Sequence, residues 1–266
     1  MKKSVKALLI FTIIGSLLAG CGGKDKGNET AANTLEKVKQ EKKIKIGLED
    51  TYPPMEFRNE KNELVGFDVD LANAIGEKLG VETEYVITEF GGLTMALNSG
   101  KFDMSLSAIS VNPDRAKEVD FSEPYVKGGQ AIIVKNDNTD ITKVEDLNDK
   151  TVGVQLGTTG EEAAKKIQGL KEVKTYDKAT QPFQDLEIGR IQAVIVDEFV
   201  GRYYLAKQEG KFKVAVTLDE EPIAIAFKKG DKELQEEVKK AIEELKQDGT
   251  MSELSKKWFG EDIYKK

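Results

Sequence analysis

Short apolar runs alternate with amphipathic segments along most of this chain. The runs that predict strands are residues 44–47, 64–67, 102–108, 131–134, 152–155 and 193–196. In the segment 102–108 every second residue is apolar, which indicates a strand with one polar face. The last three runs are continuously apolar and rich in β-branched residues, as is typical of strands buried in parallel sheets.

Between these runs, apolar residues recur at helical spacing. The predicted helices are residues 70–79, 161–167, 183–189, 199–208, 233–247 and 251–259. Gly80 directly follows the first of them and is a typical helix stop. The alternation of strands and helices predicts an α/β protein with strands enough for more than one sheet.

The first residues have the pattern of a targeting segment. A basic start is followed by an apolar run over 7–18, which is shorter than the ~20 residues that span a bilayer. Residues 18–21, LAGC, resemble the site cut by lipoprotein signal peptidase, and Cys21 is the only cysteine. The expected products are a signal peptide, 1–20, and a lipidated Cys21 followed by a flexible tether, 21–34. Two acyl chains, such as palmitate, anchor a protein stably. The alternative is an ordinary secretory signal with an incidental cysteine.

Composition favours binding over catalysis. The chain has no histidine and one cysteine, which excludes Ser-His-Asp and Cys-His catalysis and leaves zinc without its favoured ligands. A formal charge of −7 argues against nucleic acid as a partner. Residues 95–102 do not match a phosphate-binding loop, so we expect no nucleotide site. We also expect no metal or other cofactor.

A series of motifs resembles those of one protein family, in the family's order. They are residues 51–57 (TYPPMEF), 66–76 (GFDVDLANAIG), 97–103, 107–115, 120–125, 157–160 (GTTG), 248–250 and 256–260. From about residue 44 to residue 260 the chain therefore resembles the bacterial extracellular solute-binding proteins of family 3, the polar amino acid binding proteins of ABC importers.

This resemblance implies a two-lobe periplasmic-binding-protein fold of type II, with the ligand held between the lobes. Lobe 1 would comprise residues 35–125 and 221–266, and lobe 2 residues 126–220. Hinge strands are expected near 126–131 and 221–224, and closure about a hinge is a known mechanical class.

The function that the resemblance implies is capture of a free polar amino acid, with a basic amino acid or cystine favoured. The protein would deliver it to a membrane permease whose ATPase subunits are separate chains. We expect a monomer, anchored by its lipid on the extracytoplasmic face of the cell membrane.

A free amino acid needs a cation, an anion and a shaped pocket. Asn112, Pro113 and Asp114 form a helix-start pattern that places Arg115 in the first turn, where a cation is unfavourable unless an anion joins it. The guanidinium can grip a carboxylate with two hydrogen bonds. The alternative is a surface arginine paired with Asp114 or Glu118. The family has its carboxylate-binding arginine at this position of the motif.

The motif at 157–160 lies between a predicted strand and a predicted helix, where free backbone N–H groups attract an anion. The resemblance implies that Thr158 and Thr159 complete the carboxylate site from lobe 2. A plain helix cap is the alternative.

Asp197 follows the apolar run 193–196, at the edge where open α/β sheets bind ligands. The resemblance assigns it to the ligand ammonium, with carbonyl or hydroxyl contacts from Ser107, Ala108 and Ser110. Asp197 could also cap the helix that is predicted to start near Phe199.

Tyr52 and Phe90 match family positions that form aromatic walls around the ligand side chain. Phe90 is followed by two glycines where the family often has an aromatic triplet, which would widen the pocket. Glu49 falls where some relatives carry an acid that reads a cationic side chain or the second ammonium of cystine. A solvated glutamate at a strand end is the alternative.

Two other function classes are alternatives. A cyclohexadienyl dehydratase-like enzyme on the same fold would need a carboxylic acid as proton donor, a role open to Glu49, and would consume prephenate or arogenate. A sensing module of a receptor or kinase would usually continue into a transmembrane helix and a signalling domain. The chain ends six residues after Gly260, which favours the importer component.

Overall fold

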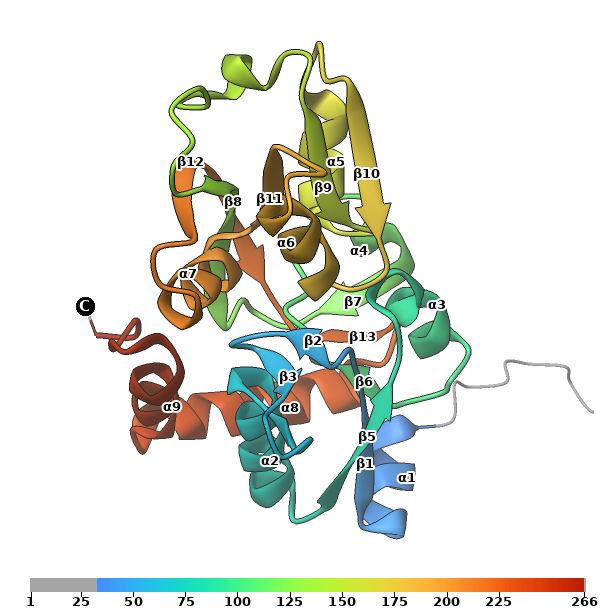
Figure 1. The fold of residues 1–266 in the computed structure, drawn as a ribbon. Helices are drawn as coiled ribbons and strands as arrows, with labels where there is room; N and C mark the ends of the chain where they lie inside the picture. The colour runs from blue at the N-terminus through green and yellow to red at the C-terminus, as the bar shows by residue number, and fades with distance from the viewer. Residues whose placement is uncertain (1–32, 266) are drawn as a thin grey trace, which may run out of the picture. The chain divides into compact units, whose positions relative to one another are not determined.

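The computed structural model describes residues 33–265 (Figure 1). The predicted signal peptide, Cys21 and the tether up to residue 32 lie outside the described residues. Helix α1 (Thr34–Glu41) begins at the last residue of the predicted tether, because the Asn33 side chain accepts the Glu36 N–H at 3.1 Å and caps the helix. Within residues 33–265, the helices are all too short or too polar to cross a membrane.

The first sheet is mixed. Its order is β5 (Glu82–Ile87), β1 (Lys43–Leu48), β6 (Met104–Ser105), β13 (Ala226–Lys228) and β7 (Val119–Phe121). Strand β1 runs parallel to β5 and β6, and β13 runs antiparallel to β6 and β7.

Helices cover both faces of the first sheet. Ile44, Ile46 and Leu48 share a core with α1, α2 (Phe67–Leu79) and α8 (Lys232–Gln247), and α9 (Thr250–Phe259) packs on α2 and α8. On the opposite face α3 (Leu93–Asn98) lies over β1, β6 and β13. Gly47 is on that second face, where a Cβ atom would lie 2.2 Å from the Phe102 ring. The sheet is therefore buried on both sides.

A small antiparallel sheet follows β1 in sequence. It consists of β2 (Thr51–Tyr52), β3 (Glu56–Arg58) and β4 (Leu64–Val65). The predicted strand at 64–67 ends two residues early, and α2 begins at Phe67, three residues before its predicted start. The reason is Gly66, whose φ of 143° turns the chain, and a Cβ atom there would lie 2.0 Å from the Met55 carbonyl oxygen.

The predicted strand at 102–108 is also too long, because only β6 pairs within it. The backbone leaves the sheet after β6, and Ala108 adopts a left-handed conformation with φ of 46°. The segment that follows leads through the short helix α4 (Arg115–Glu118) to β7.

The second sheet has the order β10 (Glu172–Tyr176), β9 (Thr151–Gln155), β11 (Ala193–Asp197), β8 (Val126–Lys135) and β12 (Phe212–Ile223). Strand β9 is parallel to β10 and β11, but β8 is antiparallel to both β11 and β12. The prediction that residues 131–134 belong to a parallel strand is therefore wrong. The run is continuously apolar because helices cover both of its faces.

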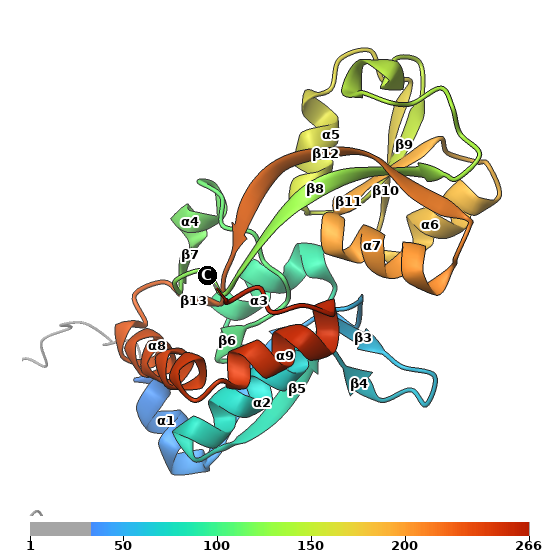
Figure 2. The ribbon, with the colours of Figure 1, turned by 90° about the vertical axis from the view of Figure 1, so that its left-hand side faces the viewer.

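Alternate residues of these strands face two different cores. Ile132, Val154 and Ile195 pack with α5 (Thr159–Lys166), whereas Ile133 and Val196 pack with α6 (Thr180–Glu187) and α7 (Glu198–Lys207). Figure 2 shows α5 on one side of this sheet and α6 and α7 on the other. Ala215, Val216 and Leu218 complete the core on the α5 side.

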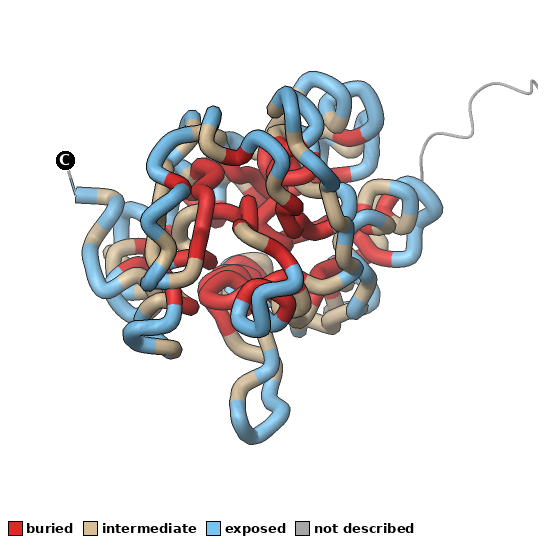
Figure 3. Tube along the Cα trace, turned by 45° about the horizontal axis from the view of Figure 1, so that its top comes forward, coloured by how far each residue is buried: buried red, intermediate tan, exposed pale blue. Residues whose placement is uncertain are grey.

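Strands β8 and β12 connect the two sheets. They pair from Lys135 and Phe212 at one end to Val126 and Ile223 at the other, with bulges near residues 215 and 218. Strand β8 continues the chain from β7, and β12 leads into β13, so both crossings between the sheets lie side by side (Figure 2). The expected hinge segments, 126–131 and 221–224, lie in or directly after these strands. The buried segments lie in the interior of the trace, and the exposed ones lie mostly on its outer turns (Figure 3).

Candidate ligand-binding site

Buried polar side chains join the second sheet to segments that follow strands of the first. The Tyr52 hydroxyl donates to Asp197 Oδ2, and Gln130 Nε2 donates to Asp197 Oδ1 at 2.7 Å. The same Gln130 nitrogen lies 3.1 Å from Thr159 Oγ1, which is 3.4 Å from Ser110 Oγ. Four of the predicted site residues therefore meet through one glutamine.

Asp197 is the last residue of β11 and only 4% exposed. Burial raises the pKa of its carboxyl to about 7, and the charge of Glu221 adds to this, while Tyr52, Arg115 and Gln130 act in the opposite direction. The residue occupies the N-cap position of α7, but its oxygens accept from Tyr52 and Gln130 instead of from helix N–H groups. Asp197 is therefore the N-cap residue by position, but its side chain does not cap the helix.

Arg115 lies at the start of α4, as predicted. The Asn112 side chain accepts the Arg115 N–H at 2.8 Å, so Asn112 is the cap that the sequence indicates. The guanidinium donates to the Ser110 carbonyl at 2.8 Å and the Gly157 carbonyl at 2.7 Å, and lies 5.3 Å from the centre of the Phe90 ring. Burial lowers the pKa of Arg115, although a guanidinium remains charged. Asp114, the first surface partner considered for Arg115, pairs with Lys117 instead.

The two threonines of the GTTG motif have different roles. Thr158 Oγ1 accepts the Glu161 N–H at 3.2 Å and donates to the Gln155 carbonyl at 2.7 Å, which makes it the helix cap. Glu161 in turn accepts the Gly157 N–H at 2.7 Å. Thr159 is buried and points to Gln130 and Ser110. The cap alternative thus describes Thr158, and Thr159 is the one that joins the network.

Glu49 directly follows β1 and is 2% exposed, so it is not a solvated glutamate. Its Oε2 accepts from Gln155 Nε2 at 2.8 Å and from the Thr51 hydroxyl at 3.1 Å. Its Oε1 has no hydrogen-bond partner within residues 33–265. Burial raises the pKa of Glu49 to about 7, against the two hydrogen bonds, which lower it.

Ser107 and Ala108 support a second pair of buried carboxyl groups. The Ser107 hydroxyl donates to Glu56 Oε1 at 2.8 Å, and the Ala108 N–H donates to Asp68 Oδ2 at 2.7 Å. Burial raises the pKa of Asp68 to about 7 and that of Glu56 well above its usual range, where the Asp68 charge adds to the effect. The hydroxyl of Ser107 and the N–H of Ala108 are therefore engaged away from Asp197, whereas Ser110 faces it through Thr159.

The two predicted aromatic residues lie on different sides of the network. Tyr52 is buried, and its ring centre lies 6.3 Å from that of Phe199. Burial raises the pKa of the Tyr52 hydroxyl further above its usual range, so it remains a hydrogen-bond donor. Phe90 is half-buried beneath Arg115 and lines a pocket of about 200 Å³ with Gly91 and Gly157.

Sequence reasoning missed two glutamines. Gln130 directly precedes the apolar run 131–134, and Gln155 ends the apolar run on β9. Both are buried, and the carbonyl oxygen of each side chain has no hydrogen-bond partner in the described part of the chain. The sequence signal that could have identified them is a polar residue at the end of a predicted buried strand. Among residues 33–265, no group of acidic, histidine or cysteine side chains is placed to hold a metal ion.

The buried carboxyl groups predict that stability falls with rising pH. Between about pH 5 and 7 the native protein retains protons on Glu49, Asp68 and Asp197, with pKa near 7, and on Glu56, while unfolded carboxyls have lost them. The free energy of unfolding should decrease by about 1.4 kcal/mol per pH unit for each retained proton. Asp185, whose pKa is lowered to about 2, is ionised in both states in this window and contributes no slope.

Urea unfolding of the protein, stripped of ligand by refolding, at pH 5, 6, 7 and 8 measures this slope. In the Glu49→Gln variant the free energy of unfolding should fall less steeply with pH than in the wild type, by about 1.4 kcal/mol per pH unit. Asp185→Asn should have the wild-type slope. Stability that is constant or increases with pH across the window would contradict the assignment of protonated carboxyl groups.

Comparisons with known proteins agree on one family. The sequence model of the bacterial extracellular solute-binding proteins, family 3, matches residues 44–261. The L-cystine-binding protein TcyJ of Escherichia coli strain K12 is 36% identical over 253 residues, 94% of each chain. A solved ancestral arginine-binding protein bound to arginine is 43% identical with a TM-score of 0.79, covering 82% of this chain and 98% of that one.

A second solved structure is the ancestral amino acid-binding protein AncCDT-1, described as a precursor of cyclohexadienyl dehydratase. It is 38% identical with a TM-score of 0.81, covering 85% of this chain and 99% of that one. These structures confirm the predicted α/β, two-lobe periplasmic-binding-protein fold of type II. The chain belongs to the bacterial extracellular solute-binding proteins, family 3.

Proposed function

We propose that this protein is the substrate-binding component of an ABC importer and holds a free amino acid between its two lobes. The observation that carries the proposal is a pair of ionisable groups of opposite sign between the two sheets. Arg115 is half-buried, and Asp197 is 4% exposed. Each shifts the pKa of the other, so they lie within electrostatic reach. A free amino acid carries the complementary pair, a carboxylate and an ammonium group attached to the same carbon.

The ligand carboxylate would bind Arg115, with the hydroxyls of Ser110 and Thr159 and the start of α5 at Thr158 as further contacts. Its ammonium would bind Asp197. Tyr52 and Phe90 would flank the ligand, and Ser107 and Ala108 would hold the adjoining segment in place through Glu56 and Asp68. The lobe boundaries that this assumes are 35–125 with 221–266 and 126–220. They agree with the division of the strands between the two sheets except that β12 of the second sheet runs on to Ile223.

Glu49 favours a ligand with a second positive charge. Its carboxyl group is buried with amide and hydroxyl partners, and one oxygen lacks a hydrogen-bond partner within residues 33–265. A cation beside it would offset the cost of burying that charge. Basic amino acids carry such a cation in the side chain, and cystine carries it as a second ammonium. The relatives named for cystine and for arginine fit these two choices.

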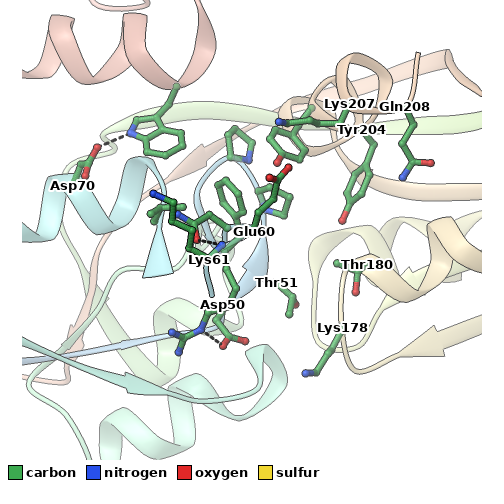
Figure 4. Close-up of a pocket in the computed structure, with 18 of the residues that line it drawn as sticks. Asp50, Thr51, Glu60, Lys61, Asp70, Lys178, Thr180, Tyr204, Lys207 and Gln208 are labelled. Carbon is green, nitrogen blue, oxygen red and sulfur yellow. Dashed lines mark hydrogen bonds and ion pairs between the residues drawn. The ribbon is translucent and has the colours of Figure 1, made fainter. Parts of the chain in front are cut away.

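Space for a long ligand lies beyond Glu49. A groove of about 1120 Å³ is bordered by Asp50 and Thr51 on one side and by Lys178 and Thr180 on the other (Figure 4). Thr51 is the residue whose hydroxyl contacts Glu49, so the groove adjoins the acid. A ligand side chain directed past Glu49 would enter it.

Thermal shifts of the refolded protein test the proposal. Arginine, lysine, ornithine, histidine, cystine and glutamine would each be added to the wild type and to Glu49→Gln. A ligand at 100 times its Kd should stabilise the folded protein by about 2.7 kcal/mol. We expect Glu49→Gln to weaken the preferred cationic ligand about 10- to 100-fold and to leave any binding of glutamine nearly unchanged.

The pattern of shifts assigns Glu49. Shifts with basic amino acids would assign it to a cationic side chain, and a shift with cystine alone to the second ammonium. A cooperative unfolding transition with no shift for any amino acid would contradict the ligand class.

A second candidate is a cyclohexadienyl dehydratase-like enzyme. The observation in its favour is Glu49, a buried carboxyl group with pKa about 7 that could serve as proton donor near neutral pH. Consumption of prephenate or arogenate by the wild type, lost in Glu49→Gln, would support this candidate against the importer component.

We also propose that lipid on Cys21 holds the protein on the outer face of the cell membrane, where it would meet the permease. The support is the LAGC sequence at 18–21 and the run of polar and small residues that follows, which would act as a tether.

A further inference from the structure

We infer that Gln130 sets the polarity of the ligand site, fixing Asp197 as the acceptor for the ammonium and Thr159 as a donor for the carboxylate. The inference rests on the proposed amino acid ligand and names a positioning residue for it. Gln130 lies on β8, opposite Asp197 on β11 in the antiparallel ladder, and is 3% exposed. Side chains in directly opposite positions of such a ladder are close neighbours.

The geometry uses both hydrogens of the amide group. Gln130 Nε2 donates to Asp197 Oδ1 at 2.7 Å and to Thr159 Oγ1 at 3.1 Å. Turning the amide over would place its carbonyl oxygen against the Asp197 carboxylate, two acceptors in contact. Ionised Asp197 therefore favours the orientation in which the amide nitrogen faces it.

The orientation determines what the two neighbours can do. Because Thr159 Oγ1 accepts from Gln130, its own hydrogen is directed elsewhere, toward Ser110 Oγ at 3.4 Å or an anion in the site. Because the Asp197 oxygens receive donors from Tyr52 and Gln130, its ionised form is stabilised against the cost of burial, and a ligand ammonium would stabilise that form further. The Gln130 amide would thus prepare Thr159 for the ligand carboxylate and Asp197 for the ligand ammonium.

The space around the amide is tightly fitted. A Cβ atom on Gly160 would lie 2.8 Å from Gln130 Oε1, so the start of α5 approaches the amide as closely as a glycine allows. The Oε1 atom has no hydrogen-bond partner in the described residues. The amide is therefore positioned by its two donated bonds and by contact with α5.

The titratable groups that face this cluster come from several elements. They are Asp197 on β11, Tyr52 on β2, Arg115 on α4, Glu162 on α5 and Glu221 on β12. Gln130→Glu keeps the shape of the side chain but replaces the donor with a carboxyl group beside Asp197. At pH 8 this group offers acceptors only, and at low pH it regains one hydrogen.

Titration calorimetry with L-arginine and L-cystine from pH 5.5 to 8.5 tests the inference. Gln130→Met should weaken binding about 10- to 100-fold at every pH, since one bond to a charged group is lost. Gln130→Glu should lose about 100-fold or more at pH 8.5, and this loss should shrink as the pH falls. The control Gln192→Glu keeps its side-chain acceptor for the Thr151 N–H and should bind like the wild type.

A measurement without ligand separates this inference from the proposed function. Carbon-13 NMR of the Asp197 carboxyl should give a midpoint about one pH unit higher in Gln130→Met than in the wild type, because a donor to the ionised form is lost. An unchanged midpoint, or equal losses of affinity in both Gln130 variants at all pH values, would overturn the inference. A wild type that binds neither amino acid but shows the midpoint shift would contradict the ligand class alone.

Discussion

The Arg115→Ala variant should bind its amino acid about 100 to 1000 times more weakly than the wild type. Removing one member of a desolvated charge pair costs about 2–5 kcal/mol, because the partner charge is left unmatched. In this protein the ligand carboxylate would face the start of α5 without a cation, and the Gly157 and Ser110 carbonyls would lose their donor. Titration calorimetry on the refolded variant measures the loss.

Two further variants separate the charge of Arg115 from its shape. Arg115→Lys keeps the charge but cannot donate to two carbonyl oxygens and grip a carboxylate at once, so we expect an intermediate loss of about 10- to 100-fold. Arg190→Ala removes a guanidinium whose side chain is 68% exposed and pairs with Asp185 at 3.2 Å, and it should bind like the wild type. An Arg115→Ala protein that binds within threefold of the wild type would refute the assignment.

The pattern of apolar residues did not predict the edge strands β5 and β10. β5 and β10 each form an edge of a sheet, and their residues are half-buried or exposed. Charged residues such as Glu82, Glu84 and Lys174 suit an edge strand because they discourage pairing with other chains. They also interrupt the apolar signal. Strands β8, β9 and β11, in the middle of the second sheet, were readable because their apolar runs are little interrupted, whereas the short central strand β13 was missed.

In the site, the sequence predicted which residues lie together but not all of the side chains that they contact. The motif order predicted that Arg115, Thr159 and Asp197 belong together, and the network connects them. It did not predict Gln130, because its contact with Asp197 depends on the pairing of β8 with β11 across 67 residues of sequence. Nor could alternation along 102–108 predict that the Ser107 hydroxyl bonds to Glu56 whereas the Ser110 hydroxyl lies beside Thr159, since the backbone turns at Ala108.

Asp197→Asn should weaken amino acid binding about 100- to 1000-fold and at the same time stabilise the ligand-free protein at neutral pH. The asparagine side chain has the same shape, and its oxygen can still accept from Gln130 while its nitrogen donates to the Tyr52 hydroxyl oxygen, so the fold should persist. The ammonium would lose its counter-charge, which accounts for the loss of affinity.

The gain in stability follows from the pKa of Asp197, about 7 in the folded protein against a usual 3.8. Above pH 4 the unfolded chain ionises this group freely, whereas the native protein must hold a buried proton or a buried charge. Removing the carboxyl group therefore raises the free energy of unfolding as the pH increases from about 4 to 7, with no change below pH 4.

Asp185→Asn is the matched control for Asp197→Asn. The pKa of Asp185 is lowered to about 2, first by Lys174 and then by Tyr176, so its loss should reduce stability above pH 4 and leave binding intact. Urea unfolding and calorimetry on both variants compare the signs directly. Loss of stability and of affinity together in Asp197→Asn would indicate that Asp197 serves the fold and not the ligand, whereas a gain of stability with a loss of affinity is expected of a carboxyl group that is buried for the ligand.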